Sequence, residues 1–287
     1  MRRMIGFIPI FAVLLTLAGC VGQPRPFEPE GRPPSHIKLE RLRVNGIDLV
    51  RVPSFSFDWS PDGKRIALGW GSLFLCAVDL ESGEVEVISE HVCLDWRSGI
   101  SWSPDGGRIA FVSRESPAKA DIYVLDLKSG EVRRITDGRG NNLYPSWSPD
   151  GKKLAFSSDR SGYFDICLVD ERGRIRKLTS STSDDVTPAW SPSGDKIAFA
   201  SIANGNADLF LINPDGTGLR RLTSHPSIDI HPSFSPDGER MVFSSNRDGD
   251  FDLYILDLRS LRIEKLAEIP GNEGDPIWGA SGIIAFR

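Results

Sequence analysis

A five-residue phrase, Trp-Ser-Pro-Asp-Gly or a close relative of it, occurs six times in this 287-residue chain. Its copies begin at Trp59, Trp102, Trp147, Trp190, Phe234 and Trp278. Successive copies are 43 to 45 residues apart, and a spacing this regular indicates a repeated supersecondary unit. The chain is therefore expected to fold as six similar units that pack side by side.

The second unit shows which strands one repeat contains. Ser103–Gly106 is a tight turn, because Pro fixes φ at its second position and Gly accepts a left-handed backbone. The turn leads into a strand at Arg108–Ser113; an apolar strand at Asp121–Asp126 and a more polar one at Glu131–Thr136 follow. With the strand that ends at the Trp, these make a four-stranded blade, and the sequence predicts an all-β, six-bladed β-propeller.

The two ends of the chain predict how the ring closes. Residues 278–287 supply only the first two strands of the sixth unit. Residues 37–52 carry two strand-like stretches around an Asn45-Gly46 hairpin turn, where the third and fourth strands of a blade belong. We expect the last blade to combine strands from both termini, a velcro closure that hides the edges of an open array. The propeller domain is expected to span residues 36–287.

The first 20 residues predict export. Arg2 and Arg3 precede an apolar run, Ile5–Leu17, that is short for a membrane-spanning helix and typical of a signal-peptide core. Residues 17–20, Leu-Ala-Gly-Cys, resemble the lipobox of bacterial lipoproteins, a pattern also found at the surface of some archaea. The resemblance implies a signal peptide over residues 1–20 that is removed, and lipidation of Cys20. A plain signal peptide or a transmembrane anchor is the alternative.

Residues 21–35 hold five prolines and little to bury, so they are expected to form an extended tether. The expected location is the periplasmic or extracellular face of a membrane, to which the lipid holds the protein. The sequence does not distinguish an inner membrane, an outer membrane and an archaeal cell surface.

Charge and cysteine content limit the partners further. A net charge of −5 offers no basic face to phosphates, which argues against nucleic acid, and we expect a monomer. Cys76, Cys93 and Cys167 stand in apolar, strand-like contexts and are expected to be small buried side chains. A Cys76–Cys93 disulfide is the alternative.

The full repeat resembles the TolB-type propeller repeat, a relative of the WD repeat. It reads Pro-x-Trp-Ser-Pro-Asp-Gly-Lys-x-Ile-Ala-Phe, then Asp-Ile-Tyr-Val and Arg-x-Leu-Thr. The resemblance covers about residues 37–287 and implies a channel rim at which partner peptides dock. TolB itself carries an α/β domain before its propeller and is not lipid-anchored. The related propellers of tricorn and prolyl-oligopeptidase-type enzymes accompany a hydrolase domain. We expect neither extra domain here.

The sequence lacks four common motifs of catalytic, nucleotide-binding and metal-binding sites. It contains no Gly-x-Ser-x-Gly, P-loop, His-Glu-x-x-His or paired Cys-x-x-Cys. His225, Asp229 and His231 suggest metal ligands, but their spacing is poor for zinc, and a single His pair of this kind is more often surface polarity. Some related propellers act as lyases or cyclases through a central site rich in histidine, which keeps an enzyme as an alternative.

The channel rim is the candidate binding site, because the first strand of each blade is innermost. Five positions before the aromatic residues stand Ser54, Arg97, Asn142, Asp185, Asp229 and Glu273. Three positions before them stand Ser56, Gly99, Tyr144, Thr187, His231 and Asp275. From these positions we expect an acidic arc of Asp185, Asp229, Glu273 and Asp275, with Asn142, Tyr144 and His231 beside it and Arg97 opposite. Such an arc suits a cation or a basic or amide-rich segment of a partner, whereas solvated loop carboxylates are the alternative.

Two further acidic patterns are expected to be structural. Asp248, Asp250 and Asp252 resemble the start of a calcium loop, but Arg259 stands where a bidentate Glu is needed. An Asp also begins the third strand of four units, where it is expected to bond backbone, Ser or Arg groups between blades. These residues are Asp121, Asp165, Asp208 and Asp252.

Together these patterns predict a non-catalytic envelope lipoprotein whose propeller binds an envelope or cell-surface protein or peptide through its channel rim. The alternatives are a propeller enzyme of the lyase or cyclase type with a metal in the channel, and a lipoprotein that binds a glycan or small ligand. The sequence calls for no cofactor and leaves a Ca²⁺ ion in the central channel open.

Overall fold

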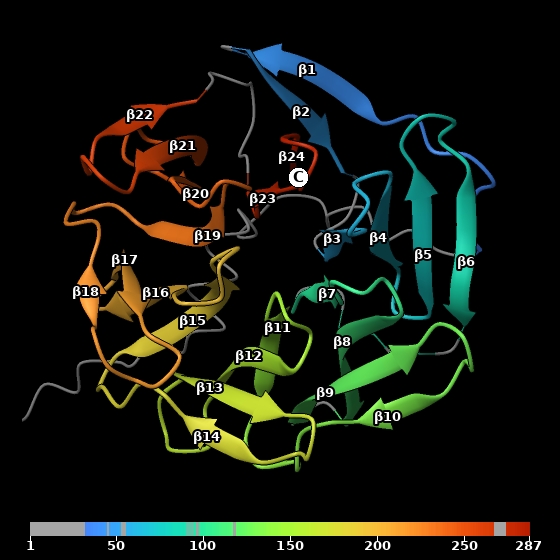
Figure 1. Cartoon of the computed structure of the whole chain (residues 1–287), viewed down its shortest axis with the longest axis horizontal. Helices are drawn as coiled ribbons and strands as arrows, with labels where there is room; N and C mark the ends of the chain where they lie inside the picture. The colour runs from blue at the N-terminus through green and yellow to red at the C-terminus, as the bar shows by residue number, and fades with distance from the viewer. Residues whose placement is uncertain are drawn as a thin grey trace, which may run out of the picture.

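The computed structural model describes residues 32–44, 46–52, 56–90, 92, 94–95, 98–116, 119–266 and 274–287. Their strands form six four-stranded sheets, arranged as blades around a central axis (Figure 1). The predicted all-β, six-bladed propeller is therefore confirmed. Within the described ranges, no helix is long and apolar enough to span a membrane. The signal peptide, Cys20 and residues 21–31 of the tether lie outside them.

The first five blades run from innermost to outermost strand in chain order. The first blade holds β3 (Phe57–Trp59), β4 (Arg65–Trp70), β5 (Phe74–Asp79) and β6 (Val85–Glu90). The second holds β7 (Ile100–Trp102), β8 (Arg108–Ser116), β9 (Lys119–Asp126) and β10 (Val132–Arg134). The third holds β11 (Asn142–Trp147), β12 (Lys153–Ser158), β13 (Asp165–Asp170) and β14 (Ile175–Lys177). The fourth holds β15 (Asp184–Trp190), β16 (Ile197–Ala203), β17 (Asn206–Ile212) and β18 (Arg220–Arg221). The fifth holds β19 (Asp229–Phe234), β20 (Arg240–Ser245), β21 (Asp252–Asp257) and β22 (Ile263–Lys265).

The sixth blade joins the two ends of the chain, as predicted. From the inside outward it holds β23 (Ile277–Trp278), β24 (Ile284–Phe286), β2 (Ile47–Arg51) and β1 (Glu40–Val44). Its two N-terminal strands occur in the opposite order from the other blades, because the outermost strand comes first in sequence. As a result β2 pairs with β24 in parallel, with Leu49 opposite Ile284.

The described end of the predicted tether is paired with the first blade. The Ile37 N–H donates to the Gly83 carbonyl at 2.8 Å, and the Val85 N–H donates to the Ser35 carbonyl at 2.8 Å. A bridge between His36 and Glu84 lies between these bonds. Residues 35–37 therefore extend the outer edge of the first blade before the chain enters β1.

The Ser-Pro-Asp-Gly phrase closes each turn with its own side chains. In the first blade, Ser60 Oγ donates to Asp62 Oδ1 at 2.6 Å and accepts the Arg65 N–H at 2.9 Å. The turn ends at Gly63, whose φ of +67° is in the left-handed region that Gly accepts without strain. These bonds satisfy the turn's polar groups locally, so the phrase specifies the hairpin between the first and second strands.

The hydrophobic core lies between neighbouring blades. The second strands of five blades bury a Phe ring, as at Phe156 and Phe243, and that of the first blade buries Leu68 at the same position. Arg65 lies over the Trp102 ring of the next blade at 5.2 Å, and Arg108 lies over Trp147 at 4.6 Å. The repeated aromatic residue thus packs the second blade against the first and the third against the second.

Cys76 and Cys167 are buried and free. Burial raises the pKa of the Cys76 thiol to about 12 and that of Cys167 to about 11. Both therefore have the predicted role of small buried side chains. Cys93 lies outside the described residues.

Candidate functional site

The residue three positions before the aromatic has an unusual backbone conformation in four of the blades. Tyr144, Thr187, His231 and Asp275 have φ values between +51° and +55°. Each precedes a proline, which cannot donate to the strand ladder. In β11 the pairing with β12 shifts between Leu143 and Ser146, and equivalent shifts occur in β15 and β19. These β-bulges change the direction of the side chains on the innermost strands.

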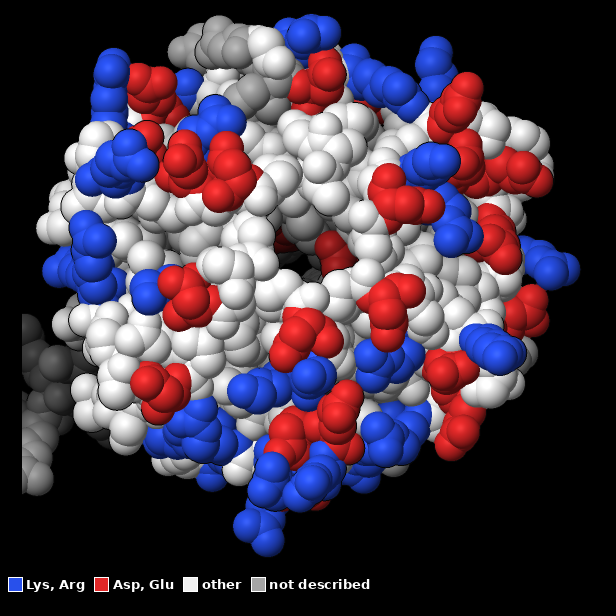
Figure 2. Space-filling model, in the orientation of Figure 1, with Lys and Arg blue, Asp and Glu red and all other residues white. Residues whose placement is uncertain are grey.

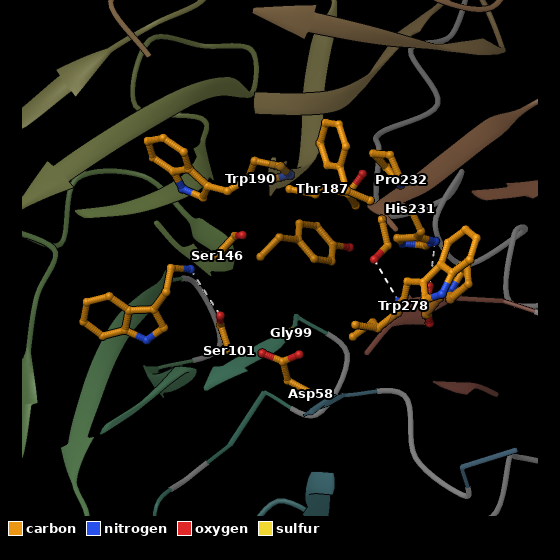
Figure 3. A pocket seen from close by; sticks show the side chains of 18 of the residues that line it. Asp58, Gly99, Ser101, Ser146, Thr187, Trp190, His231, Pro232 and Trp278 are labelled. Atoms are coloured by element: carbon orange, nitrogen blue, oxygen red, sulfur yellow. Dashed lines mark hydrogen bonds and ion pairs between the residues drawn. The ribbon is translucent and has the colours of Figure 1, made fainter. Parts of the chain in front are cut away.

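A cavity of about 440 Å³ occupies the channel, and the innermost strands of all six blades line it. Figure 2 shows the central opening on one face, and Figure 3 shows side chains from several blades around the cavity. Much of the wall is apolar: it includes Pro145, Pro188, Pro192, Pro232, Pro236, Pro276, Phe57, Trp147, Trp190, Phe234 and Trp278. Cavities of roughly 300–1,000 Å³ with mostly apolar walls are typical of ligand-binding sites.

A polar cluster lies on one side of the cavity. His231 Nδ1 and Asp275 Oδ1 are 2.6 Å apart, and Arg287 forms an ion pair with the other oxygen of Asp275. Burial acts to raise the pKa of Asp275, but Arg287 and His231 together hold it well below its usual value. The Tyr144 ring meets the His231 ring edge-on at 6.3 Å. Burial and the Asp275 charge raise the pKa of Tyr144, which keeps its hydroxyl neutral.

Asp58 lies in the first blade's part of the wall. Its carboxylate accepts the Trp59 N–H at 2.8 Å and the Trp102 N–H of the second blade at 2.8 Å. Burial raises the pKa of Asp58 to about 7, although these two amide bonds act in the opposite direction. Ser101 and Ser233 stand at the same position of their repeats, and their hydroxyls accept the amides of Trp147 and Trp278. These bonds link successive blades around the channel.

The residues five positions before the aromatic are placed differently from the expectation. Asn142 Oδ1 accepts Ser158 Oγ at 2.8 Å and Arg160 Nη2 at 3.1 Å. Asp229 accepts Arg247 at 2.9 Å. Asp185 is also buried, and none of the three lines the cavity.

The expected acidic arc is therefore not assembled within the described residues. These positions precede the bulge in their strands, and their side chains point into the blades and the seams between blades instead of into the channel. Of the predicted rim residues, Tyr144, His231 and Asp275 do share the cavity wall. Arg97 and Glu273 lie outside the described residues.

The suggested metal ligands are not brought together. His225 Nδ1 lies 2.9 Å from Ser227 Oγ, Asp229 is bound by Arg247, and His231 faces Asp275. Among the described residues no group of three or more His, Cys, Asp or Glu side chains is arranged to hold a metal ion.

Each acidic residue that begins a third strand forms an ion pair with a Lys or Arg of its own blade. The expected contacts between blades are fewer. Lys177 Nζ lies 2.6 Å from Asp165, and Lys265 Nζ lies 2.8 Å from Asp252. Asp121 and Asp208 pair with Arg134 and Arg221 in the same way. The contact from Asn142 Nδ2 to Asp121 Oδ1, at 3.1 Å, does cross to the next blade.

Sequence reasoning missed Asp58 and Arg287 as parts of the site. Asp58 stands immediately before the Trp of the repeat, where the other units carry Ser, Ala or Ile, and that departure was the available signal. Arg287 gave no signal, because its contact with Asp275 depends on how the sixth blade folds.

The repeat region of the chain matches a known protein family. Residues 42–186 and 165–286 match the TolB beta propeller domain, and together these segments cover most of the chain. The chain belongs to the TolB β-propeller family. No curated protein sequence matches it.

Solved TolB structures have the same fold. A structure described as putative TolB from Agrobacterium tumefaciens is 27% identical, with a TM-score of 0.68, over 75% of this chain and 82% of that one. TolB from Acinetobacter baumannii is 24% identical, with a TM-score of 0.69, over 86% of this chain and 65% of that one. The present TolB-like propeller thus spans about two thirds of the Acinetobacter protein.

An enzyme has a similar fold. Oligogalacturonate lyase from Vibrio parahaemolyticus is 17% identical, with a TM-score of 0.59, over 85% of this chain and 75% of that one. This likeness concerns the fold alone. Because TolB proteins and an enzyme both resemble the chain, the function depends on the chemistry of its own channel.

Proposed function

We propose that this TolB-like propeller is a non-catalytic protein-binding module whose channel cavity receives a peptide segment of a partner. The observation that carries the proposal is the cavity itself, about 440 Å³ in volume and lined by all six blades. Its proline and aromatic wall suits apolar side chains. The serine, threonine and carboxylate groups between them suit a peptide backbone.

The charges of the wall suggest which segment fits. Asp275 is compensated by Arg287 and His231. Asp58 has no cationic partner among the described residues; the amides of Trp59 and Trp102 and the hydroxyl of Ser101 bond to it. A segment with an apolar or aromatic side chain and a neighbouring Lys, Arg or amide group would pack on the wall and pair with Asp58.

The lipid anchor belongs to the same proposal. A lipidated Cys20 followed by a proline-rich tether would hold the channel near a membrane surface outside the cytoplasm. The partner is then an envelope or cell-surface protein. Labelling with radioactive palmitate, compared between wild type and Cys20→Ala, tests the anchor; equal labelling would contradict it.

Co-purification from detergent-solubilised envelopes tests the binding site. Tyr144→Ala removes an aromatic ring from the cavity wall, and Tyr163→Ala removes the same side chain from an exposed position outside it. We expect Tyr144→Ala to lose a specific partner that wild type and Tyr163→Ala retain. Retention of every partner by Tyr144→Ala, with an unchanged circular dichroism spectrum, would contradict the channel as the site.

One feature favours the enzyme alternative, namely the close contact of His231 and Asp275 in a cavity wall. A carboxylate beside a histidine can orient the ring for proton transfer. A metal in the channel is part of that alternative. Elemental analysis of the purified protein that finds a stoichiometric transition metal would favour it over the binding module.

The cavity volume also suits a small ligand or a short glycan. A ligand that binds the folded state raises the melting temperature by mass action. A thermal-shift screen of oligosaccharides therefore separates this alternative from peptide binding, because a peptide module should give no shift with any sugar.

A further inference from the structure

Two carboxylates and one cation meet at the seam between the third and fourth blades, that is, where the facing sides of the two blades are in contact. Asp165 is 1% exposed and Asp185 is 2% exposed. Lys177 Nζ lies 2.6 Å from Asp165 Oδ2. No Lys or Arg among the described residues pairs with Asp185. A buried carboxylate without a cation is normally neutralised by a proton or by a bound ion.

In the next seam around the ring, each buried carboxylate has an arginine partner. Between the fourth and fifth blades, Arg221 pairs with Asp208 and Arg247 pairs with Asp229. In the fourth blade, Ala203 stands at the repeat position that Arg160 and Arg247 occupy in the third and fifth blades. The guanidinium that would compensate Asp185 is therefore replaced by a methyl group.

The seam between the second and third blades shows which bond the Asp185 position makes. There Asn142 stands at the equivalent position, and its amide Nδ2 donates to Oδ1 of Asp121 at 3.1 Å. Asp165 is the equivalent of Asp121. Its Oδ1 is buried and accepts no hydrogen bond from the described part of the chain. An ionised Asp185 cannot donate to it, whereas a protonated carboxyl can.

We propose that Asp185 is held as the neutral acid and donates its proton to Oδ1 of Asp165, so that the two carboxyl groups share one proton across this seam. The bond replaces the amide bond from Asn142 to Asp121 in the neighbouring seam. It makes the contact between the third and fourth blades dependent on pH.

The other charged and polar groups around the pair agree with this assignment. Burial, together with the charge of Asp165, raises the pKa of Asp185, although hydrogen bonds from Ser201, Thr179 and Ser181 act to lower it. Asp184 on the same strand and Asp159 on the β12–β13 connection add negative charge, and burial also raises the pKa of Asp184. Arg160, which stands in the third blade at the repeat position of Ala203, is bound to Asn142 and Asp137.

The direction of the pH effect follows from proton linkage. A carboxyl with a raised pKa in the folded state binds its proton more tightly there than in the unfolded chain. The stability that it contributes is fully present below about pH 4, its unfolded value, and is lost as the pH rises through the folded value. One such proton changes the unfolding equilibrium constant by about tenfold per pH unit within that window.

Denaturant unfolding of the full chain from pH 4 to pH 8 tests the proposal. Asp185→Asn replaces the acid by the amide that the neighbouring seam uses, so it should fold and should lose this pH dependence. As the pH rises, we expect the unfolding equilibrium constant of wild type to increase relative to that of Asp185→Asn by up to about tenfold per pH unit. Parallel curves for the two proteins would overturn the shared proton.

Two controls distinguish the shared proton from a general loss of charge and from a bound cation. Asp229→Asn removes a carboxylate that already has a guanidinium, so it should lower stability throughout this range without changing the slope. If millimolar Ca²⁺ stabilises wild type but not Asp185→Asn, the pair binds a cation and the proposal is wrong. If Asp185→Asn does not fold, infrared spectroscopy of wild type with ¹³C-labelled Asp decides: a carboxylic acid band that persists above pH 4 supports the proposal, and its absence overturns it.

Discussion

The carboxylate of Asp58 in the first blade accepts the backbone N–H of Trp102 in the second blade at 2.8 Å. The bond lies in the wall of the channel, so one side chain both joins two blades and faces the cavity. Ser101 and Ser233 make the equivalent bond with a neutral hydroxyl. Asp58 therefore places a titratable group where a partner would bind.

The ionisation of Asp58 gives the first prediction. Burial raises its pKa to about 7, so the folded chain holds this proton more tightly than the unfolded chain. Stability from Asp58 should be present below about pH 4 and should fall as the pH rises through 7. The Asp58 carboxyl resonance in ¹³C NMR should titrate near pH 7 and be missing in Asp58→Asn. A midpoint near 4 would contradict the burial of the charge.

Backbone strain at Thr187 gives the second prediction. This β-branched residue has a φ of +53°, is 6% exposed and has a hydroxyl with no hydrogen-bond partner among the described residues. Thr187→Gly should relieve strain and raise the free energy of unfolding by about 1 kcal/mol. Thr136→Gly is the control, because the Thr136 hydroxyl accepts the Ile122 amide and its loss should destabilise. Destabilisation by both substitutions in urea unfolding would refute the strain.

The pair of Arg247 and Asp229 gives the third prediction. Arg247 Nη2 lies 2.9 Å and 3.0 Å from the two oxygens of the fully buried Asp229. Arg247→Ala leaves a buried carboxylate without its cation, which should cost about 3–5 kcal/mol in the free energy of unfolding. Arg259 is an exposed arginine in the same blade, and Arg259→Ala should change it by less than about 0.5 kcal/mol. Similar losses for both variants would argue against a structural role for the pair.

The closure of the ring gives the fourth prediction. Leu49 of β2 is fully buried against the C-terminal strand, whereas Leu219 is 61% exposed. Leu49→Ala should lower the free energy of unfolding by about 2–5 kcal/mol, and Leu219→Ala should leave it nearly unchanged. Thermal unfolding measures both. A small effect of Leu49→Ala would mean that the N-terminal hairpin contributes little to closing the propeller.

The repeat predicts the architecture because each unit specifies its own turn. The bonds of Ser60 and Asp62 within one phrase define a hairpin without help from the rest of the chain. The closure of the sixth blade follows from counting strands. The order of β1 and β2 does not, because two strands joined by a hairpin can occupy the two outer positions in either order.

The site is predicted less well because a β-bulge separates the two candidate positions. Tyr144 and Asn142 are two residues apart, and in a regular strand they would share a face. The positive φ of Tyr144 breaks that alternation, so Tyr144 lines the cavity and Asn142 is buried in its blade. Nothing in the spacing of the repeat indicates this break except the proline that follows Tyr144.

Site-specific photocross-linking tests the central proposal most directly. A benzophenone amino acid replaces Tyr144 in the cavity wall or Tyr163 outside it, and intact cells are irradiated before the protein is purified. We expect a discrete cross-linked partner protein from position 144 and none from position 163. The same partner from both positions, or from position 163 alone, would contradict the channel as the binding site.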